Sequence, residues 1–241
     1  MADIPAALLV GGMGTRLRSV LARTPKPLAP VGGRSFLGLL VRQLRAQGIR
    51  RVVMCTGYLA DQIESVFGDG SAWGVAIKYS RERHPLGTAG AVKLAQPCLH
   101  PASHFLVMNG DSFLEINLHQ LSQFHLRNGG LVTMAVRRVK DAGRYGTVQV
   151  TAGNRVSGFA EKTGADTASL VNAGVYVFGP SIFDFIPEGE ASFERDVFPR
   201  ILSRGVYALE QHGVFVDIGT PEDYARAQVL SDQLWNAASR R

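Results

Sequence analysis

The chain has 241 residues, 46% of them hydrophobic, which is enough for one sizeable core or at most two small domains. Its net charge of +6 suits small polyanionic substrates better than nucleic acid, because its 26 basic residues are scattered among 20 acidic ones. No basic segment precedes the first apolar run, which is too short to cross a membrane, so we expect a cytoplasmic protein without a nucleic-acid or membrane partner.

Short apolar runs alternate with helical spacing of apolar residues along the first half of the chain. The runs predict strands at residues 6–10, 52–55, 76–79 and 105–108. Helical spacing predicts helices near residues 36–44, 60–67 and 89–95, and a further helix whose core-facing side carries Leu118, Leu121, Phe124 and His125. Because helices separate the strands, we expect a largely parallel, doubly wound sheet.

Antiparallel strands are predicted after residue 130. The sequence predicts strands at 131–139, 147–150 and 156–160, the last two joined by a tight turn, then a strand at 173–178, a helix at 193–202 and a strand at 214–216. A closing helix at 221–234 has Thr220 as its expected N-cap and Pro221 in its first turn. Since no linker or repeat interrupts this order, we expect residues 1–241 to form one α/β domain, a Rossmann-like three-layer α/β/α sandwich with a mixed, mostly parallel central sheet.

A glycine-rich loop follows the first predicted strand. It runs Gly-Gly-Met-Gly-Thr-Arg-Leu from residue 11 to residue 17, and glycine lets backbone N–H groups approach phosphate oxygens without a Cβ in the way. The third glycine of a dinucleotide fingerprint is missing, and no Gly-Lys-Ser or Gly-Lys-Thr follows, so neither common phosphate loop is present. With the cations of Arg16 and Lys26, the loop indicates a nucleoside triphosphate, although the loop alone also fits an ordinary turn.

Two aspartates follow predicted strands. Asp111 comes after the strand at 105–108, and Asp217 comes after the strand at 214–216. Ligands of open α/β sheets bind at the carboxyl ends of strands, and Mg²⁺ that accompanies a nucleotide takes one or two protein carboxylates. Both aspartates are therefore candidate Mg²⁺ ligands, while either one alone is equally typical of a turn or a helix cap. The two cysteines and six histidines have no metal-ligand spacing, so we expect no metal among them.

The glycine-rich loop, followed by Lys26 between two prolines, resembles the signature of the sugar-1-phosphate nucleotidyltransferases. Motif content and order are similar to this family from residue 8 to residue 224. Residues 85–90 resemble the family's guanylyltransferases of mannose 1-phosphate and of heptose 1-phosphate, whereas thymidylyltransferases usually carry Leu-Ala-Gln-Ala at this place. Residues 16–20, 25–31, 144–148 and 192–194 resemble the guanylyltransferases of D-glycero-α-D-manno-heptose 1-phosphate. Val10 departs from the Ala or Cys that the family usually has before the glycine pair.

The resemblance implies a GT-A-like fold, Mg²⁺ as the cofactor with Mn²⁺ as a substitute, and GTP and a sugar 1-phosphate as partners. It implies four catalytic residues: Arg16, Lys26, Asp111 and Asp217, of which the two aspartates hold the metal. The implied nucleotide-binding residues are Leu9, Gly11, Gly12, Gly14, Thr15, Arg16, Glu82, Gly87, Thr88 and Gly110. The implied sugar-phosphate-binding residues are Gly146, Glu161, Lys162, Asn172 and Gly174. Glu82 is a candidate acceptor for the N–H groups of guanine, and a solvated Glu82 is an equal alternative.

On this resemblance the chain transfers a guanylyl group from GTP to a sugar 1-phosphate and releases pyrophosphate. The expected acceptor is D-glycero-α-D-manno-heptose 1-phosphate, and the GDP-heptose product would feed cell-surface polysaccharide synthesis (capsule, lipopolysaccharide or S-layer glycan). The alternatives are guanylyl transfer to mannose 1-phosphate, uridylyl or thymidylyl transfer to another hexose 1-phosphate, and a non-catalytic module that binds nucleotide sugars. The combination of two cations with two carboxylates argues against the last of these. The sequence leaves the oligomeric state open, and a homo-oligomer is compatible with it.

Overall fold

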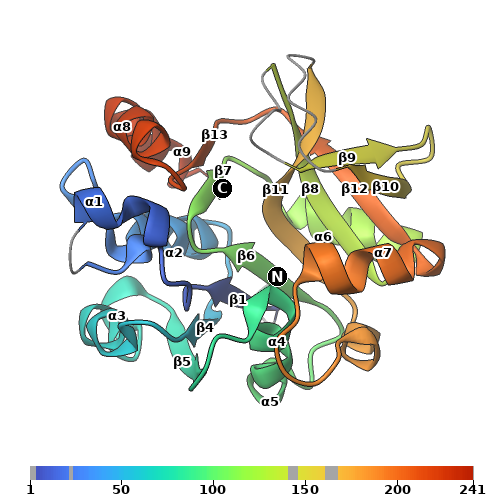
Figure 1. The fold of residues 1–241 in the computed structure, drawn as a ribbon, viewed down its shortest axis with the longest axis horizontal. Helices are drawn as coiled ribbons and strands as arrows, with labels where there is room; N and C mark the ends of the chain where they lie inside the picture. Colours follow the sequence, from blue (N-terminus) through green and yellow to red (C-terminus); the bar gives the residue numbers. More distant parts are fainter. Residues whose placement is uncertain (1–3, 22–23, 141–145, 161–167, 241) are drawn as a thin grey trace.

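The computed structural model describes residues 4–21, 24–140, 146–160 and 168–240 (Figure 1). A nine-stranded sheet runs through the molecule, and helices cover both of its faces. This arrangement confirms the predicted α/β/α class. Within the described ranges, no helix is both long enough and apolar enough to cross a membrane.

The first half of the chain forms the parallel part of the sheet. Its strands are β1 (Pro5–Leu9), β4 (Arg51–Thr56), β5 (Ala76–Arg81) and β6 (Phe105–Asn109). In the sheet β1 lies between β4 and β6, and β5 pairs with the other side of β4, all in parallel. All four strands were predicted, with β1 ending one residue earlier than expected. Their carboxyl ends therefore meet along one edge of the sheet.

In the described ranges, the second half adds five strands, which pair antiparallel except for the last of them, which joins its neighbour in parallel. They are β8 (Val132–Val139), β9 (Thr147–Val150), β10 (Val156–Ala160), β11 (Ser169–Phe178) and β12 (Val206–Gln211). The long strand β11 joins the two halves, because it runs antiparallel to β6, β8 and β9. β9 and β10 form the predicted hairpin. β12, which the sequence did not predict, lies parallel to β8, and its irregular order of buried residues explains why no strand period was visible.

Two apolar cores lie on opposite faces of the sheet. The helices over the first core are α2 (Phe36–Ala46), α3 (Ala60–Phe67), α6 (Leu118–Asn128), α8 (Pro221–Val229) and α9 (Ser231–Ala237). Those over the second are α4 (Gly87–Leu94), α5 (Gln96–Leu99) and α7 (Phe198–Ile201). In β1, Ala6 and Leu8 face the first core and Ala7 faces the second. Burial on both faces explains why β1 reads as a continuous apolar run.

Several short elements differ from the prediction. They are α1 (Arg18–Leu21), β2 (Pro30–Val31), β3 (Arg34–Ser35) and β7 (Ser112–Leu114), which were not predicted, whereas β13 (Phe215–Asp217) is the strand predicted at 214–216, shifted by one residue. β13 pairs with β7 in a small sheet of its own, and three residues are too few to give β7 a visible period. The helix predicted at 193–202 begins with a π-helical turn, Phe193–Val197, that precedes α7. The helix predicted at 221–234 is interrupted at Leu230, although Thr220 does cap its start.

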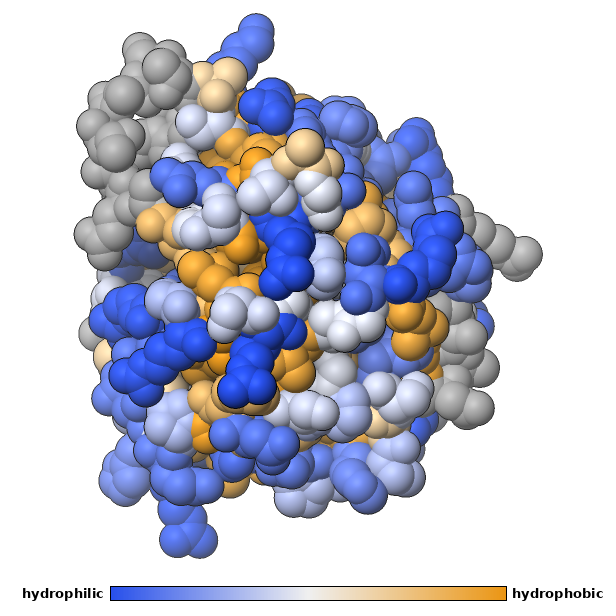
Figure 2. Space-filling model, turned by 90° about the vertical axis from the view of Figure 1, so that its right-hand side faces the viewer, coloured by the Kyte–Doolittle hydropathy of each residue, from blue (hydrophilic) through white to orange (hydrophobic). Residues whose placement is uncertain are grey.

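The second core reaches the edge of the molecule beside the β9–β10 hairpin. On the face that carries this hairpin and α7, hydrophobic surface shows between hydrophilic side chains (Figure 2). Phe159 of β10 stacks on Phe198 of α7, with 5.9 Å between the ring centroids. The hairpin is thus held against α7 by aromatic packing.

Candidate active site

The glycine-rich loop leaves the carboxyl end of β1 and is fastened to its surroundings. The carbonyl of Gly11 accepts the N–H of Tyr58 at 3.1 Å, which ties the loop to the segment after β4. Gly14 has a φ of +57°, and a Cβ at this position would lie 2.9 Å from the Cβ of Lys26. Glycine is therefore required where the stem of Lys26 passes the loop.

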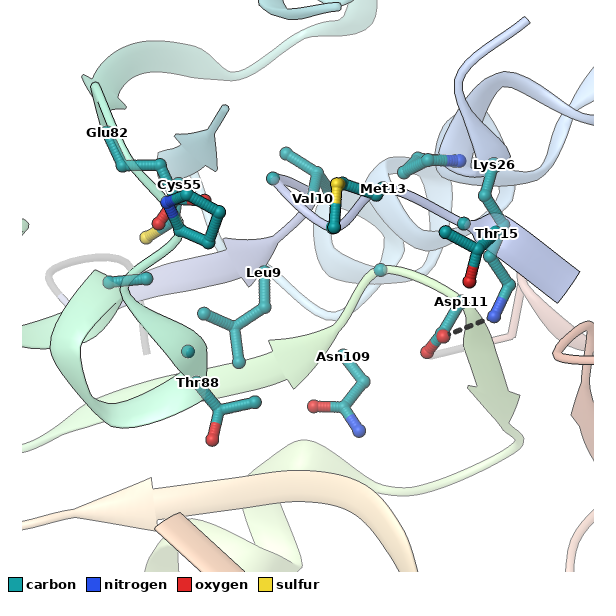
Figure 3. A pocket seen from close by; sticks show the side chains of 18 of the residues that line it. Leu9, Val10, Met13, Thr15, Lys26, Cys55, Glu82, Thr88, Asn109 and Asp111 are labelled. Atoms are coloured by element: carbon teal, nitrogen blue, oxygen red, sulfur yellow. Dashed lines mark hydrogen bonds and ion pairs between the residues drawn. The ribbon is translucent and has the colours of Figure 1, made fainter. Parts of the chain in front are cut away.

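A cavity of about 410 Å³ opens between this loop and the carboxyl ends of β1, β5 and β6, a size typical of small-molecule sites. Figure 3 shows Glu82 at one end of it and Lys26 with Asp111 at the other, with Thr88 and Asn109 along the opposite wall. Lys26 and Asp111 line this cavity. All ten residues predicted to bind the nucleotide line it as well: Leu9, Gly11, Gly12, Gly14, Thr15, Arg16, Glu82, Gly87, Thr88 and Gly110.

Lys26 and Asp111 form an ion pair at one end of the cavity. The Lys26 Nζ lies 2.5 Å from the Asp111 Oδ2, and the side chains are 10% and 36% exposed (Figure 3). Gly110 positions the aspartate, because its N–H donates to the carbonyl of Leu9 at 2.9 Å and a Cβ at 110 would collide with that carbonyl at 2.5 Å. The chain after β6 is thus held close against the end of β1.

Asp217 approaches Asp111 from the end of β13. The N–H of Ile218 donates to the carbonyl of Asp111 at 2.9 Å, and the N–H of Gly219 donates to the Asp217 Oδ1 at 2.6 Å. Burial and the negative charge of Asp111 raise the pKa of Asp217 to about 6, while the ammonium group of Lys26 acts in the opposite direction. The structure therefore brings together both predicted aspartates, although one follows β6 and the other ends β13, far apart in the sequence.

This pair of carboxylates fits a divalent metal ion. Burial first and then the negative charge of Asp111 disfavour the ionised form of Asp217, and a hard cation that takes oxygen ligands would offset both effects. Across the described part of the chain, three or more His, Cys, Asp or Glu side chains do not gather into a metal cluster. A metal held by Asp111 and Asp217 would then draw its other ligands from water and phosphate, as is usual for Mg²⁺.

Glu82 forms the other end of the cavity. Its Oε2 accepts the N–H of Leu86 at 3.1 Å, and burial raises the pKa of the carboxyl group above its usual value despite this hydrogen bond. Its Oε1 lies 2.9 Å from where a Cβ of Gly11 would stand and 2.6 Å from that of Gly57. Glu82 is therefore a half-buried residue whose carboxylate is held in place, because one oxygen orders the following loop and the other is packed between two glycines.

The N-terminus of α4 forms one wall of the cavity. Gly87 has a φ of +68°, and a Cβ there would lie 2.5 Å from the carbonyl oxygen of Ala191. That carbonyl accepts the N–H of Ala89 at 2.9 Å, so the first turn of α4 is pinned to the segment before α7. Thr88 is held in the same way, since its Oγ1 accepts the N–H of Phe193 at 2.8 Å. The positive end of α4 is thus fixed beside the cavity.

The predicted sugar-phosphate residues are only partly described. Glu161 and Lys162 lie outside the described residues, and Gly146 is an exposed residue just before β9. Asn172 and Gly174 lie in β11, where the pairing with β8 shifts register. Gly174 has a φ of +72°, and a Cβ there would lie 2.7 Å from the Nδ2 of Asn109, which lines the cavity. Gly174 therefore lies next to a residue of the nucleotide cavity, and Asn172 is joined to Gly174 by a hydrogen bond of 3.1 Å.

A family model described as nucleotidyl transferase matches residues 6–233. The chain belongs to the nucleotidyl transferase family. It is 38% identical to the D-glycero-alpha-D-manno-heptose 1-phosphate guanylyltransferase of Aneurinibacillus thermoaerophilus, over 92% of this chain and 96% of that protein. It is 40% identical to the mannose-1-phosphate guanylyltransferase of Mycobacterium tuberculosis, over 93% of this chain but only 63% of that protein. Its fold matches the crystal structure of HddC from Yersinia pseudotuberculosis complexed with GMP-PN, with a TM-score of 0.85 and 31% identity over 94% of this chain and 98% of that one.

Sequence reasoning missed several residues that line the cavity of this nucleotidyl transferase. They are Val10, Met13, Pro27, Cys55, Pro85, Ala91, Asn109, Glu190 and Gly219. The sequence could have indicated Asn109 and Gly219, since each lies two residues from a predicted aspartate at a strand end. Glu190 belongs to no motif and reaches the cavity only through the fold. Cys55 contributes an uncharged thiol to the lining of the cavity, because burial raises the pKa of this thiol to about 12.

Proposed function

We propose that this nucleotidyl transferase transfers a guanylyl group from GTP to D-glycero-α-D-manno-heptose 1-phosphate, giving GDP-heptose and pyrophosphate. The observation that carries the proposal is the cavity itself, which is lined by the glycine-rich loop and by Arg16, and which has an ion pair at one end and a half-buried carboxylate at the other. The heptose acceptor is supported by the Aneurinibacillus relative, because this chain spans 96% of its length. We place the reaction in the cytoplasm and its product in cell-surface polysaccharide synthesis.

Mannose 1-phosphate is the second candidate acceptor. It is favoured by the 40% identity to the Mycobacterium relative. That relative is considerably longer, and this chain spans less than two thirds of it. The heptose acceptor is therefore the preferred proposal, and both acceptors lead to the same chemistry at the guanylyl group.

The reaction is an in-line displacement at the α-phosphorus of GTP. A phosphate oxygen of the sugar 1-phosphate forms the new bond to phosphorus, and the bond from the α-phosphorus to the bridging oxygen of pyrophosphate breaks. The attacking oxygen is already an anion, so no general base is needed. The protein instead has to hold two polyanions together and neutralise their charge. In this proposal Arg16 binds the departing β- and γ-phosphates, and Lys26 binds the α-phosphate.

The other residues orient the substrates. Asp111 and Asp217 would hold Mg²⁺, or Mn²⁺ in its place, and the ion would supply positive charge to the phosphates when it is bound. Glu82 would accept from the N1–H and N2–H groups of guanine, a pair of donors that suits a carboxylate. Asn172, Gly174, Gly146, Glu161 and Lys162 remain the proposed contacts of the sugar phosphate.

The proposal is tested by pyrophosphate release. GTP, UTP, dTTP, ATP and CTP are each combined with heptose, mannose and glucose 1-phosphates, with Mg²⁺ and with a chelator. Release that needs Mg²⁺ and occurs only with GTP and the heptose 1-phosphate is the expected result. Preference for mannose 1-phosphate or for another base would overturn the proposed specificity, and no release from any pair would favour a binding module.

The role of Glu82 is tested with Glu82→Gln. The amide oxygen of glutamine can still accept the N–H of Leu86, so the loop keeps its hydrogen bond while the acceptor for guanine is lost. We expect the KM for GTP to rise at least about tenfold, which is typical when a hydrogen bond to a charged group is lost. Glu210→Gln is the matched control, because Glu210 pairs with the exposed Arg138. An unchanged preference for GTP in Glu82→Gln would refute the role.

A further inference from the structure

A chain of hydrogen bonds connects Asn172 with the nucleotide cavity. The Asn172 Nδ2 donates to the Tyr176 hydroxyl at 2.6 Å, and that hydroxyl donates to the Glu194 Oε1 at 3.2 Å. The other oxygen of Glu194 accepts from the hydroxyl of Thr88 at 3.2 Å and from that of Ser192 at 2.8 Å. Since Thr88 lines the cavity, the two ends of this chain lie on the two proposed substrate sides.

The carboxylate fixes the direction of every hydrogen bond in this chain. An ionised carboxylate only accepts, so Tyr176 must give its one proton to Glu194. The Tyr176 oxygen is then left as the acceptor for Asn172, which must turn its NH₂ group towards it. The amide oxygen of Asn172 accordingly accepts the N–H of Gly174 at 3.1 Å. A charge at Glu194 thus sets the orientation of an amide two hydrogen bonds away.

The middle of the chain is rigid. The Tyr176 side chain is fully buried, and its ring stacks on Phe178 at 5.6 Å and packs against Phe198 at 5.6 Å between centroids. Burial and the charge of Glu194 raise the pKa of Tyr176 well above its usual value, so the hydroxyl keeps its proton at neutral pH. A fixed ring with a protonated hydroxyl can hold the amide of Asn172 in a single orientation.

We propose that Glu194 and Tyr176 are positioning residues that fix which group of the Asn172 amide faces the sugar 1-phosphate and tie that amide to Thr88 on the nucleotide side. This inference rests on the proposed function, in which Asn172 contacts the sugar phosphate. The Nδ2 of Asn172 donates one hydrogen bond and its Oδ1 accepts one, so the amide retains one N–H and one lone pair for a sugar hydroxyl. Glu194 and Tyr176 act through Asn172 and need no contact with the substrate.

Two single variants test the positioning. Tyr176→Phe removes the hydroxyl and frees the amide to rotate. In Glu194→Gln the glutamine oxygen can still accept from Thr88 and Ser192, but its NH₂ group then faces Tyr176, whose proton has no acceptor. We expect the KM for the sugar 1-phosphate to rise about tenfold in both variants, while the KM for GTP changes less than about threefold. Tyr79→Phe is the matched control, because it removes a hydroxyl that is bonded to the carbonyl of Gly68 outside the site.

A double-mutant cycle separates positioning from direct contact. If Glu194 acts through Asn172, Glu194→Gln has little further effect on the KM for the sugar 1-phosphate once Asn172→Ala is present. If the KM for the sugar 1-phosphate in the double variant rises by the product of the two single-variant fold-changes, the proposal is overturned, because Glu194 would then act independently of Asn172. An unchanged KM for the sugar 1-phosphate in Glu194→Gln would overturn it as well. If Tyr176→Phe does not fold, the cycle between Glu194 and Asn172 still decides.

Failure of this inference is distinguishable from failure of the proposed function. The variants are compared on whichever sugar 1-phosphate and nucleotide the wild-type enzyme uses, so a wrong base or a wrong sugar leaves the comparison intact. A wild-type enzyme without turnover overturns the proposed function. In that case the Kd for heptose 1-phosphate, measured by calorimetry, replaces the KM in the same double-mutant cycle. If the wild-type protein does not bind heptose 1-phosphate, the inference is overturned as well.

Discussion

Lys26→Met removes the ammonium group at the phosphate end of the cavity and keeps an apolar stem of similar length. The Nζ of Lys26 lies 2.5 Å from Asp111, and its side chain is only 10% exposed, so neighbouring water replaces its charge poorly. A unit charge about 4 Å from a phosphate oxygen is worth about 4 kcal/mol at an effective dielectric constant near 20. Part of this energy is already present in the ground state, so we expect kcat to fall about 10²–10³-fold.

The loss has a second consequence for the carboxylates. Lys26 lowers the pKa of Asp217, whereas Asp111 raises it, so removal of Lys26 moves the pKa of Asp217 further above about 6. The site of the variant thus carries two carboxylates whose repulsion is no longer offset by this ammonium group. The substitution is expected to weaken the alignment of the phosphates as well as their charge neutralisation.

The assay is pyrophosphate release at saturating GTP and sugar 1-phosphate, with thermal unfolding to verify that the variant is folded. Lys78→Met is the matched control, because Lys78 is an exposed residue of β5 outside the cavity. Its kcat is expected to stay close to that of the wild type. A folded Lys26→Met enzyme with kcat within about threefold of the wild type would refute the role of Lys26 at the α-phosphate.

Three further predictions concern the scaffold. Burial and the neighbouring His104 lower the pKa of His125 from 6.5 to about 4, so the unfolded state binds more protons than the folded state between these pH values. The free energy of unfolding should therefore rise with pH across this window, by up to about 3 kcal/mol. Denaturant unfolding at pH 5 and pH 7.5 should show a smaller difference in stability between the two pH values for His125→Gln than for the wild type. Trp235→Phe removes the indole N–H that donates to the Val31 carbonyl at 3.0 Å, and we expect denaturation to show a loss of about 1–3 kcal/mol; an unchanged midpoint would contradict this. Gly90→Ala would ordinarily stabilise helix α4, but the new Cβ would collide with the carbonyl oxygen of Gly189. We therefore expect a lower Tm for this variant. An equal or higher Tm would show that the structure relaxes around the new Cβ without cost.

The parallel half of the fold could be predicted because its strands are buried on both faces. Such strands read as unbroken apolar runs, and the helices between them are long enough to show their period. The same signal fails for β12 and β7. β12 mixes buried and half-buried residues without a clean alternation, and β7 has only three residues. The break at Leu230 carries no local signal, because neither glycine nor proline stands at or next to this position.

The nucleotide side of the site was more predictable than the sugar side. The residues of the glycine-rich loop are contiguous in sequence, so a single motif places most of them at once. Asp111 follows β6 and Asp217 is the last residue of β13, and the pairing of β7 with β13 brings them together. Tyr176 and Glu194 lie in no predicted motif position for the sugar, because their connection to Asn172 exists only through hydrogen bonds across β11 and the segment before α7.

The shape of the cavity is set by backbone positions as much as by charged side chains. Gly57 illustrates this, since it belongs to no motif that the sequence analysis used. A Cβ at Gly57 would lie 2.6 Å from the Oε1 of Glu82, and a Cβ at Gly11 would lie 2.9 Å from the same atom. The two glycines therefore leave the space that the carboxylate occupies, and an alanine at either position would displace Glu82 from the end of the cavity. The proposed choice of guanine thus depends on three residues from three different connections of the sheet, of which only the glycine-rich loop has a recognisable signature.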